Sequence, residues 1–334
     1  MKVSGWAADE SACGFYRIAQ PFAALAAAGE DVSVETTAVR GADLLEDGTT
    51  LIVAQRTADP EQTILLDALK QGGIPYLYET DDALLNLDPA NPVAKAYASP
   101  VVRFVIETAM LNAEAITVST PELAEMVSPY GEAHVLPNAL PDYFLSLDFD
   151  SIEGRKSDGI VVVSWAGSST HHGDFHKEVQ YGLRKSLAWN DHLRFVCQGH
   201  DYRRALRVEG IHVPWSEDIP SFHRSLTGYD IGLCPLAVTP FNKAKSGLKA
   251  MEYQAAGVVP VAQDMPGYRS IITDGVDGFL VRTAKEWLDA IQTLATDHEL
   301  RARMREAGLA RTAERTYSAR VGEWQAVYRK FSAS

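Results

Sequence analysis

The chain has 334 residues, enough for two domains, and its 46% hydrophobic, 22% charged and 9% aromatic residues are the proportions of a folded globular protein. This composition excludes a disordered or fibrous chain. The net charge of −13 is concentrated in residues 1–150, which hold 7 basic against 23 acidic residues, whereas the remainder holds 24 against 21. Because so acidic a half repels phosphate backbones and anionic headgroups, nucleic acid and charged membranes are disfavoured as partners.

The sequence predicts neither a membrane-spanning helix nor an export signal. No apolar stretch reaches the roughly 18 residues that a membrane helix needs. Asp9 and Glu10 interrupt the start before the apolar core of a signal peptide can form. We therefore expect a cytoplasmic protein. Its three widely spaced cysteines, Cys13, Cys197 and Cys234, predict reduced thiols rather than a disulfide framework.

Short, continuously apolar runs predict parallel strands that are buried on both faces. In chain order these runs lie at 32–34, 51–54, 74–78, 115–118, 135–136, 160–164, 194–197, 230–234 and 258–262. Helical patterns alternate with them, the clearest at 17–28, 174–189, 245–256 and 284–295. This alternation predicts an α/β fold of two Rossmann-like, doubly wound domains.

A polar stretch from Pro137 to Gly159 marks the predicted domain boundary. We assign residues 1–150 to an N-terminal domain, 158–316 to a C-terminal domain, and 317–334 to a helix that packs back on the N-terminal domain. The tail from His298 is predicted to be helical throughout, with a solvated face of Arg301, Arg303, Arg305, Arg311 and Arg315. Ligands of parallel sheets bind beyond the carboxyl ends of the strands, so we expect a cleft between the domains.

One predicted helix, 245–256, combines basic, acidic and small residues. At helical spacing Lys245, Lys249 and Glu252 form a stripe beside an apolar one. A helix start exposes unpaired N–H groups that suit a diphosphate, which would be bound by Lys245, Ser246, Gly247 and Leu248. The Glu252 carboxylate can accept hydrogen bonds from the two hydroxyls of a ribose. A surface helix with lysine–glutamate pairs explains this segment equally well by itself.

Residues 241–281 resemble the donor-binding region of GT-B fold glycosyltransferases, in particular family 4. The likeness rests on the Lys/Glu helix with Glu252-Tyr253, the glycine and strand after it, and the run Asp274-Gly275-Val276-Asp277-Gly278-Phe279-Leu280-Val281. Residues 116–121 and 136–138 are similar to the end of the family's first domain, and residues 161–167 to the first strand and turn of its second domain, so these parts follow in the same order as in the family. The resemblance implies two domains facing across a cleft. It also implies a hexosyltransferase-type enzyme that moves a sugar from a nucleoside diphosphate to an acceptor hydroxyl, with retained configuration and without a metal or other cofactor.

The resemblance also implies donor contacts outside this helix, from Gly14 and Arg17 in the N-terminal domain. Independently of the resemblance, the small, hydroxyl-rich loop after residue 164 suits close approach by a phosphate or sugar, so Gly167, Ser168 and His171 are further candidates for donor binding. A simple turn and a helix-start arginine without a ligand are the alternatives. Two departures from the family stand out. Ala244 occupies the position of the family's first glutamate, and the 165–173 loop lacks its arginine and lysine. Lys245 must then carry more of the phosphate charge, with help from His171 if that side chain is protonated.

Two adjacent carboxylates, Asp81 and Asp82, follow a buried strand and should project at the cleft edge. Glycosyl transfer passes through an oxocarbenium-like state that a carboxylate can stabilise, so we predict that one of them is catalytic. A plain helix cap is the alternative. His171, His172 and His176 permit a zinc hypothesis, but no further clustered ligand completes a tetrahedral set, so no metal is predicted.

The sequence thus favours a glycosyltransferase that uses a nucleotide-sugar donor. Its acidic N-terminal half favours a neutral or basic acceptor, whether a glycan, a small molecule or a protein. Two alternatives remain open: a sugar-nucleotide epimerase or hydrolase, and a non-catalytic protein that binds a nucleotide sugar or glycan, which the Ala244 departure makes more credible.

Overall fold

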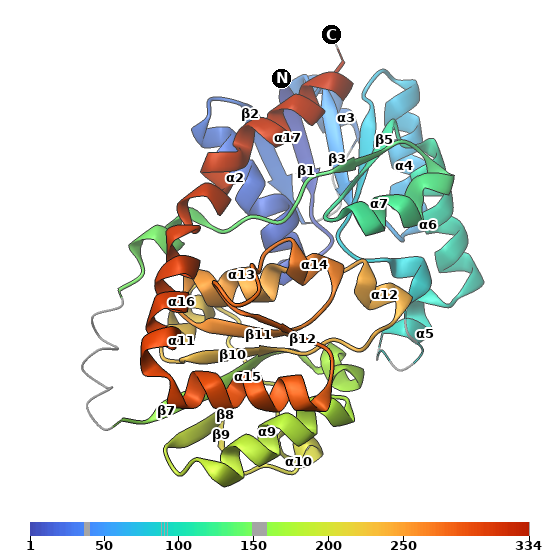
Figure 1. Ribbon diagram of the computed structural model, residues 1–334. Coiled ribbons are helices and arrows are strands. Elements are labelled where there is room, and N and C mark those ends of the chain that lie inside the picture. The colour runs from blue at the N-terminus through green and yellow to red at the C-terminus, as the bar shows by residue number, and fades with distance from the viewer. Residues whose placement is uncertain (37–40, 88, 90, 92, 149–158, 334) are drawn as a thin grey trace.

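The computed structural model describes residues 1–334 except 37–40, 88, 90, 92, 149–158 and 334, and it does not describe the side chains of Thr170 and His172. It contains two six-stranded parallel sheets flanked by helices (Figure 1), which confirms the predicted α/β class. The residues on either side of the predicted boundary, 150 and 158, lie outside the described part of the chain.

The N-terminal sheet has the order β2-β1-β3-β4-β5-β6. Its strands are β1 (Lys2–Trp6), β2 (Asp31–Glu35), β3 (Leu51–Gln55), β4 (Tyr76–Thr80), β5 (Ala115–Val118) and β6 (Ala133–Val135). The helices between them are α1 (Ala12–Gly14), α2 (Gln20–Ala27), α3 (Gly41–Asp47), α4 (Pro60–Gln71), α5 (Ala94–Tyr97), α6 (Pro100–Asn112) and α7 (Pro121–Val127). A π-helical turn, Phe15–Ala19, joins α1 to α2, and short 3-10 turns lie at Leu84–Asn86, Ser128–Tyr130 and Asp142–Ser146.

The C-terminal sheet has the order β12-β11-β10-β7-β8-β9. Its strands are β7 (Val161–Gly167), β8 (Leu193–Gly199), β9 (Ile211–Val213), β10 (Ile231–Cys234), β11 (Val259–Gln263) and β12 (Phe279–Val281). Its helices are α9 (Lys177–Trp189), α10 (Arg203–Leu206), α11 (Ile219–Leu226), α12 (Pro240–Lys243), α13 (Leu248–Ala255), α14 (Pro266–Arg269), α15 (Ala284–Thr296) and α16 (His298–Ala310), and a 3-10 turn covers Ser169–Asp174.

The central strands are apolar because helices cover both faces of each sheet. Every residue of β3, β4 and β11 is buried, as continuous apolar runs predict. Helix starts follow the expected capping chemistry: the side chain of Asp59 caps α4, that of Thr120 caps α7, and Thr283 with Glu286 forms a capping box on α15. Among the described residues, no helix is both long and apolar enough to cross a membrane.

The C-terminal segment α17 (Tyr317–Phe331) leaves the domain that precedes it and lies along α2 of the N-terminal domain (Figure 1). Its buried Tyr317, Trp324 and Tyr328 belong to the N-terminal core. The prediction of a tail that is helical throughout from His298 is therefore wrong. The tail breaks at Thr316, which is extended and caps α17, while Leu140 bonds to the backbone on both sides of the break.

The predicted solvated arginine face is wrong at its C-terminal end. Arg315 is buried and donates hydrogen bonds to the Gln254 side chain and to the Ile271 carbonyl. Arg311 also reaches the Ile271 carbonyl, and it pairs with buried Asp277 at 3.0 Å. These guanidinium groups satisfy buried oxygen atoms of the loop before β12, a requirement that helical periodicity does not reveal.

Candidate functional site

A cleft of about 270 Å³ lies where the carboxyl ends of the two sheets face each other. Its walls come from the segments after β1, β4 and β6 on one side and after β7, β9, β10 and β11 on the other. The predicted site residues that line it are Asp81, Asp82, Gly167, Ser168, His171, Lys245, Ser246, Leu248 and Glu252. Gly14, Arg17 and Gly247 do not line it.

Lys249 also lines the cleft, although it was not predicted as a donor contact. Its ammonium donates a hydrogen bond to the Ala166 carbonyl at the end of β7 and lies 5.4 Å from the centre of the Trp165 ring. Burial lowers the pKa of Lys249, and Lys245 lowers it further, against opposing effects of Cys234 and Glu252. No ion pair among the described residues includes Lys249. Because a desolvated ammonium without a counterion is costly, this position favours an anionic ligand.

Lys245, which comes just before α13, reaches across the cleft to Asp82 of the N-terminal domain. Its Nζ lies 3.6 Å from Asp82 Oδ1, and the Arg56 guanidinium lies 2.9 Å from Asp82 Oδ2. Arg56 also donates to Asp81 Oδ1 at 2.9 Å. Burial acts to raise the pKa of Asp82, but Lys245 and Arg56 outweigh it, so this pKa lies below its usual range. Asp82 is thus ionised, and Arg56 and Lys245 already occupy part of its capacity to accept hydrogen bonds.

Arg56 is a site residue that the sequence analysis missed. It follows directly on buried β3 and adopts a φ of +49°, in the left-handed region. This conformation is costly for a residue with a Cβ, and such strain is often kept where a side chain must be aimed. A charged residue at the carboxyl end of a buried strand was the signal that could have identified it.

Glu252 lies in a buried hydrogen-bond network. Its Oε1 accepts a hydrogen bond from the Tyr16 hydroxyl and lies 3.1 Å from His223 Nε2. His223 Nδ1 is 2.6 Å from the Tyr143 hydroxyl. Burial acts to raise the pKa of Glu252, but His223 and Tyr16 lower it below its ordinary value. The carboxylate is ionised and borders the cleft, as ribose binding requires, but part of it is occupied by Tyr16 from the opposite domain.

Two residues that were predicted to bind the sugar donor, Arg17 and Gly14, lie behind the cleft and support its loops. Arg17 is 1% exposed, and its guanidinium is used by Glu79, by the Leu136 carbonyl and by Asn138 Oδ1. The Gly14 amide donates to Asp9 Oδ1, and a Cβ at Gly14 would lie 1.8 Å from the Asp9 carbonyl oxygen. In this structure neither residue points a free hydrogen-bond donor into the cleft. Gly14 belongs to the turn that carries Cys13, and Arg17 fixes the segment after β6 through Leu136 and Asn138.

Helix α13 begins at Leu248, later than the predicted start at Lys245, with Gly247 as its N-cap residue. Ser246 accepts a hydrogen bond of 2.9 Å from the Asn138 side chain, which joins the two domains at the helix start. Gly247 does not face the cleft. A Cβ on it would lie 2.3 Å from the Gly267 carbonyl oxygen and 2.4 Å from Ile271 Cγ1. Close packing against the α14 segment, not approach of a ligand, therefore requires this glycine.

We expect Gly247→Ala to lower the free energy of unfolding by about 1 to 3 kcal/mol, since the added methyl group meets backbone that cannot move away cheaply. Chemical denaturation measures this change. Gly322→Ala on α17 is the matched control, because no atom lies within 4 Å of a Cβ there. Equal stabilities of the two variants would contradict the packing role.

His171 is neutral in the folded protein. Burial lowers its pKa to about 4, and although its 2.8 Å contact with Asp174 opposes this effect, Lys249 and Lys245 add to the lowering. The predicted help from a protonated His171 is therefore wrong at neutral pH. Because ionised Asp174 accepts the hydrogen on Nδ1, the neutral ring keeps Nε2 as an acceptor, which suits a hydroxyl donor better than a phosphate.

This lowered pKa predicts an acid-sensitive fold. Between pH 6.5 and about 4 the unfolded chain binds a proton at residue 171 that the folded chain does not. The free energy of unfolding should thus fall with falling pH, by at most about 1.4 kcal/mol per pH unit from this group. Denaturation of the wild type and of His171→Asn across that range tests this expectation, and parallel pH profiles would contradict it.

The zinc hypothesis finds no support in the described side chains. His171 and His176 pair with Asp174 and Glu178 at 2.8 Å, and the side chain of His172 lies outside the described residues. Within the part of the chain that the structure describes, no three His, Cys, Asp or Glu side chains are grouped to hold a metal ion.

Comparisons with known proteins agree with this architecture. Residues 209–311 match the family described as Glycosyl transferases group 1. The D-inositol 3-phosphate glycosyltransferase of Stackebrandtia nassauensis is 31% identical over 107 residues, which cover 30% of this chain and 24% of that protein. The match thus spans about a quarter of the length of this relative.

Two solved structures resemble almost the whole chain. HepE of Anabaena, in complex with UDP-glucose, has a TM-score of 0.68 and 14% identity over 98% of this chain and 100% of that one. The sucrose-phosphate synthase of Thermosynechococcus elongatus has a TM-score of 0.71 and 15% identity over 99% and 98%. The chain therefore has the GT-B glycosyltransferase fold and carries, at residues 209–311, the sequence pattern of the glycosyl transferases group 1 family.

Proposed function

We propose that this protein transfers a hexose from a nucleoside diphosphate sugar to the hydroxyl group of an acceptor. The observation that carries the proposal is the desolvated ammonium of Lys249, which has no ion-pair partner among the described residues and lines the same cleft as Lys245 and ionised Glu252. The two ammonium groups match the diphosphate of a nucleotide, and the Glu252 carboxylate can accept hydrogen bonds from the ribose hydroxyls of the same ligand.

The cleft offers a place for each part of a nucleotide. The diphosphate lies between Lys245 and Lys249 at the amino end of α13, where the helix exposes N–H groups. The ribose hydroxyls bind Glu252 on the next turn. Trp215, which is 49% exposed at the cleft wall and stacked on Phe222, presents an aromatic face to the base.

The chemistry follows from the charge that develops during transfer. As the bond between the anomeric carbon and the diphosphate oxygen breaks, negative charge grows on the leaving diphosphate, and Lys245 and Lys249 stabilise it more than they stabilise the ground state. The acceptor oxygen bonds to the anomeric carbon from the same face, and its proton passes to the released diphosphate. Because the two lysines already supply positive charge, we propose that no metal is needed, and activity should survive EDTA.

Asp82 has a limited role in this scheme. Its lowered pKa makes it a weak base, so we assign it the task of accepting a hydrogen bond from the acceptor hydroxyl and of stabilising the positive charge on the sugar. Asp81, held by the same arginine, supports this position. Two acidic side chains at the acceptor side favour a neutral or basic acceptor.

Release of UDP from UDP-glucose tests the proposal, and the UDP-glucose complex of HepE motivates the choice of donor. We expect release that depends on added acceptor from a panel of neutral glycosides and alcohols. Equal release without any acceptor would indicate a hydrolase, and a changed sugar on the nucleotide would indicate an epimerase. Binding of UDP without turnover on any acceptor would indicate a non-catalytic binding protein.

We expect Tyr16→Phe to bind UDP more tightly, by roughly fivefold or about 1 kcal/mol, because the Tyr16 hydroxyl occupies Glu252 Oε1 and a ribose hydroxyl has to displace it. Isothermal titration calorimetry with UDP measures the change, with Tyr143→Phe as the control, since Tyr143 contacts His223 but not Glu252. A loss of affinity in Tyr16→Phe would instead show that the hydroxyl contacts the nucleotide.

A further inference from the structure

His171 lines the interdomain cleft with one of its ring nitrogens unused. Its side chain is 16% exposed and lies edge-on to the Trp165 ring, with 5.9 Å between the ring centres. Nδ1 lies 2.8 Å from Asp174 Oδ2, whereas Nε2 has no hydrogen-bond partner among the described residues. An unused polar atom in the wall of a cleft is a candidate contact for a ligand.

The residues behind this ring determine which nitrogen carries its hydrogen. Asp174 Oδ1 accepts hydrogen bonds from the Ala237 amide at 2.9 Å and from Asn242 Nδ2 at 2.7 Å. The same Nδ2 donates to the Ala237 carbonyl, which can only accept, so the orientation of the Asn242 amide is also determined. Burial acts to raise the pKa of Asp174, but His171 and Ala237 lower it below its usual range. Because ionised Asp174 can only accept, the hydrogen of neutral His171 lies on Nδ1, and Nε2 is an acceptor.

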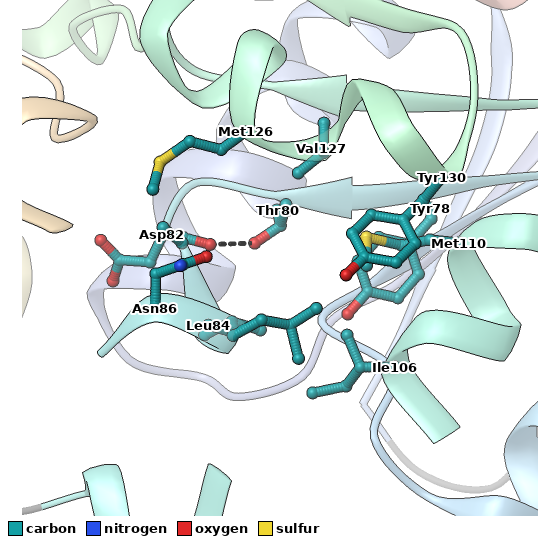
Figure 2. A pocket seen from close by; sticks show the side chains of 12 residues that line it. Tyr78, Thr80, Asp82, Leu84, Asn86, Ile106, Met110, Met126, Val127 and Tyr130 are labelled. Atoms are coloured by element: carbon teal, nitrogen blue, oxygen red, sulfur yellow. Dashed lines mark hydrogen bonds between the residues drawn. The ribbon is translucent and has the colours of Figure 1, made fainter. Parts of the chain in front are cut away.

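The acidic side chains of the cleft, by contrast, already hold partners. Figure 2 shows the Asp82 carboxylate pointing away from the cavity of about 40 Å³ beside it, and this carboxylate contacts Arg56 at 2.9 Å instead. Glu252 Oε1 accepts a hydrogen bond from Tyr16. A ligand hydroxyl at either carboxylate therefore competes with an existing contact, whereas at His171 Nε2 it competes with no described side chain.

His171 lies near the proposed diphosphate position and apart from the ribose position. Lys249 Nζ is 5.4 Å from the centre of the same Trp165 ring that His171 contacts. The hydrogen-bond networks around His171 and Glu252 share no described residue. With the diphosphate at Lys245 and Lys249 and the ribose at Glu252, the part of a nucleotide sugar that remains for His171 is the sugar.

We infer that His171 is a specificity-determining residue for the sugar of the nucleotide-sugar substrate: its Nε2 accepts a hydrogen bond from one hydroxyl group of the hexose, and Asp174 is the positioning residue that keeps Nε2 unprotonated. Ionised phosphate oxygens have no hydrogen to donate to such an acceptor, whereas every hexose hydroxyl has one. The site therefore rejects a hexose in which another acceptor replaces that hydroxyl. The inference rests on the proposed function and adds the feature of the sugar that the protein recognises.

UDP-glucose and its four analogues with fluorine in place of one hydroxyl group, at carbon 2, 3, 4 or 6, test this inference by calorimetry without an acceptor. Fluorine is close in size to a hydroxyl group but cannot donate a hydrogen bond. We expect at least one analogue to bind the wild type about tenfold more weakly than UDP-glucose, because two acceptors then face each other and Nε2 is left unpaired. Equal affinities for all five compounds would overturn the inference.

Asp174→Asn moves the hydrogen to the other ring nitrogen. The Ala237 amide can only donate, so the new side chain keeps its oxygen there and turns its NH2 group toward His171 Nδ1. Nδ1 then accepts, and Nε2 carries the hydrogen. Since a hydroxyl group can also accept and fluorine can accept weakly, UDP-glucose should bind within about threefold of its wild-type affinity, and the loss caused by the fluorine should fall below about threefold.

Nitrogen-15 NMR of the imidazole rings locates this hydrogen without any ligand, since protonated and unprotonated ring nitrogens have widely separated chemical shifts. We expect an unprotonated Nε2 of His171 in the wild type and a protonated one in Asp174→Asn, with His171→Asn identifying the signal. A protonated Nε2 in the wild type would contradict the assigned role.

Glu178→Gln is the matched control, because Glu178 pairs with His176 at 2.8 Å and neither residue lines the cleft. It should leave the affinities for all five compounds unchanged. A wild type that binds neither UDP nor UDP-glucose would refute the proposed function and this inference with it. Binding of UDP together with a fluorine effect that Asp174→Asn leaves unchanged would refute the role of His171 alone.

Discussion

Lys249→Met is expected to weaken UDP binding by roughly 10- to 150-fold, or about 1.5 to 3 kcal/mol, the contribution of a charge-assisted hydrogen bond in a desolvated site. The same change should raise the free energy of unfolding by about 1 kcal/mol, because it removes a partly buried ammonium that has no ion-pair partner among the described residues. A residue whose loss stabilises the free protein and weakens ligand binding is kept for the ligand. Calorimetry with UDP and thermal unfolding measure the two effects.

Lys243→Met is the matched control, since this exposed lysine at the end of α12 lies close in sequence but does not line the cleft. It should leave UDP affinity and stability within experimental error. Unchanged affinity in Lys249→Met would remove the main support for the diphosphate position. A destabilised Lys249→Met would mean that its bond to Ala166 is structural.

Arg17→Met is expected to lower the free energy of unfolding by about 3 to 5 kcal/mol, because it leaves the Glu79 carboxylate buried without its countercharge. Both side chains are 1% exposed, and their two hydrogen bonds measure 2.7 and 3.1 Å. Burial already raises the pKa of Glu79 in spite of Arg17, so its loss should raise that pKa further. Urea denaturation at pH 7 measures the loss.

The double variant Arg17→Met/Glu79→Gln separates the charge from the packing. With both charges removed, we expect it to recover much of the lost stability. UDP affinity should be lower than that of the wild type in both variants, since Arg17 also orients Asn138, whose amide donates to Ser246 across the domain interface. A double variant as unstable as the single one would show that shape, rather than charge, governs this position.

The sequence predicted the architecture well because parallel strands are buried on both faces and leave continuous apolar runs. Strands such as β3 and β5 lie within a residue of their expected ranges. The predicted start of α13 is too early because Lys245 falls at helical spacing with Lys249 and Glu252, while the helix begins only after Gly247, which packs against Gly267.

The side-chain pairs of the site were beyond sequence reasoning. Arg17 and Glu79 are 62 positions apart, and Tyr16 and Glu252 are 236 apart. Nothing in local spacing shows that Arg17 satisfies a buried carboxylate and not a phosphate. The loop composition did suggest a shortage of positive charge near His171, and the structure brings Lys249 to the neighbouring end of β7.

A crystal structure of the protein with bound UDP would locate the nucleotide. We expect the diphosphate oxygen atoms within hydrogen-bond distance of Lys245 and Lys249, and the ribose hydroxyls on Glu252 with the Tyr16 hydroxyl displaced. A nucleotide bound outside this cleft, or one whose diphosphate contacts neither lysine, would contradict this expectation.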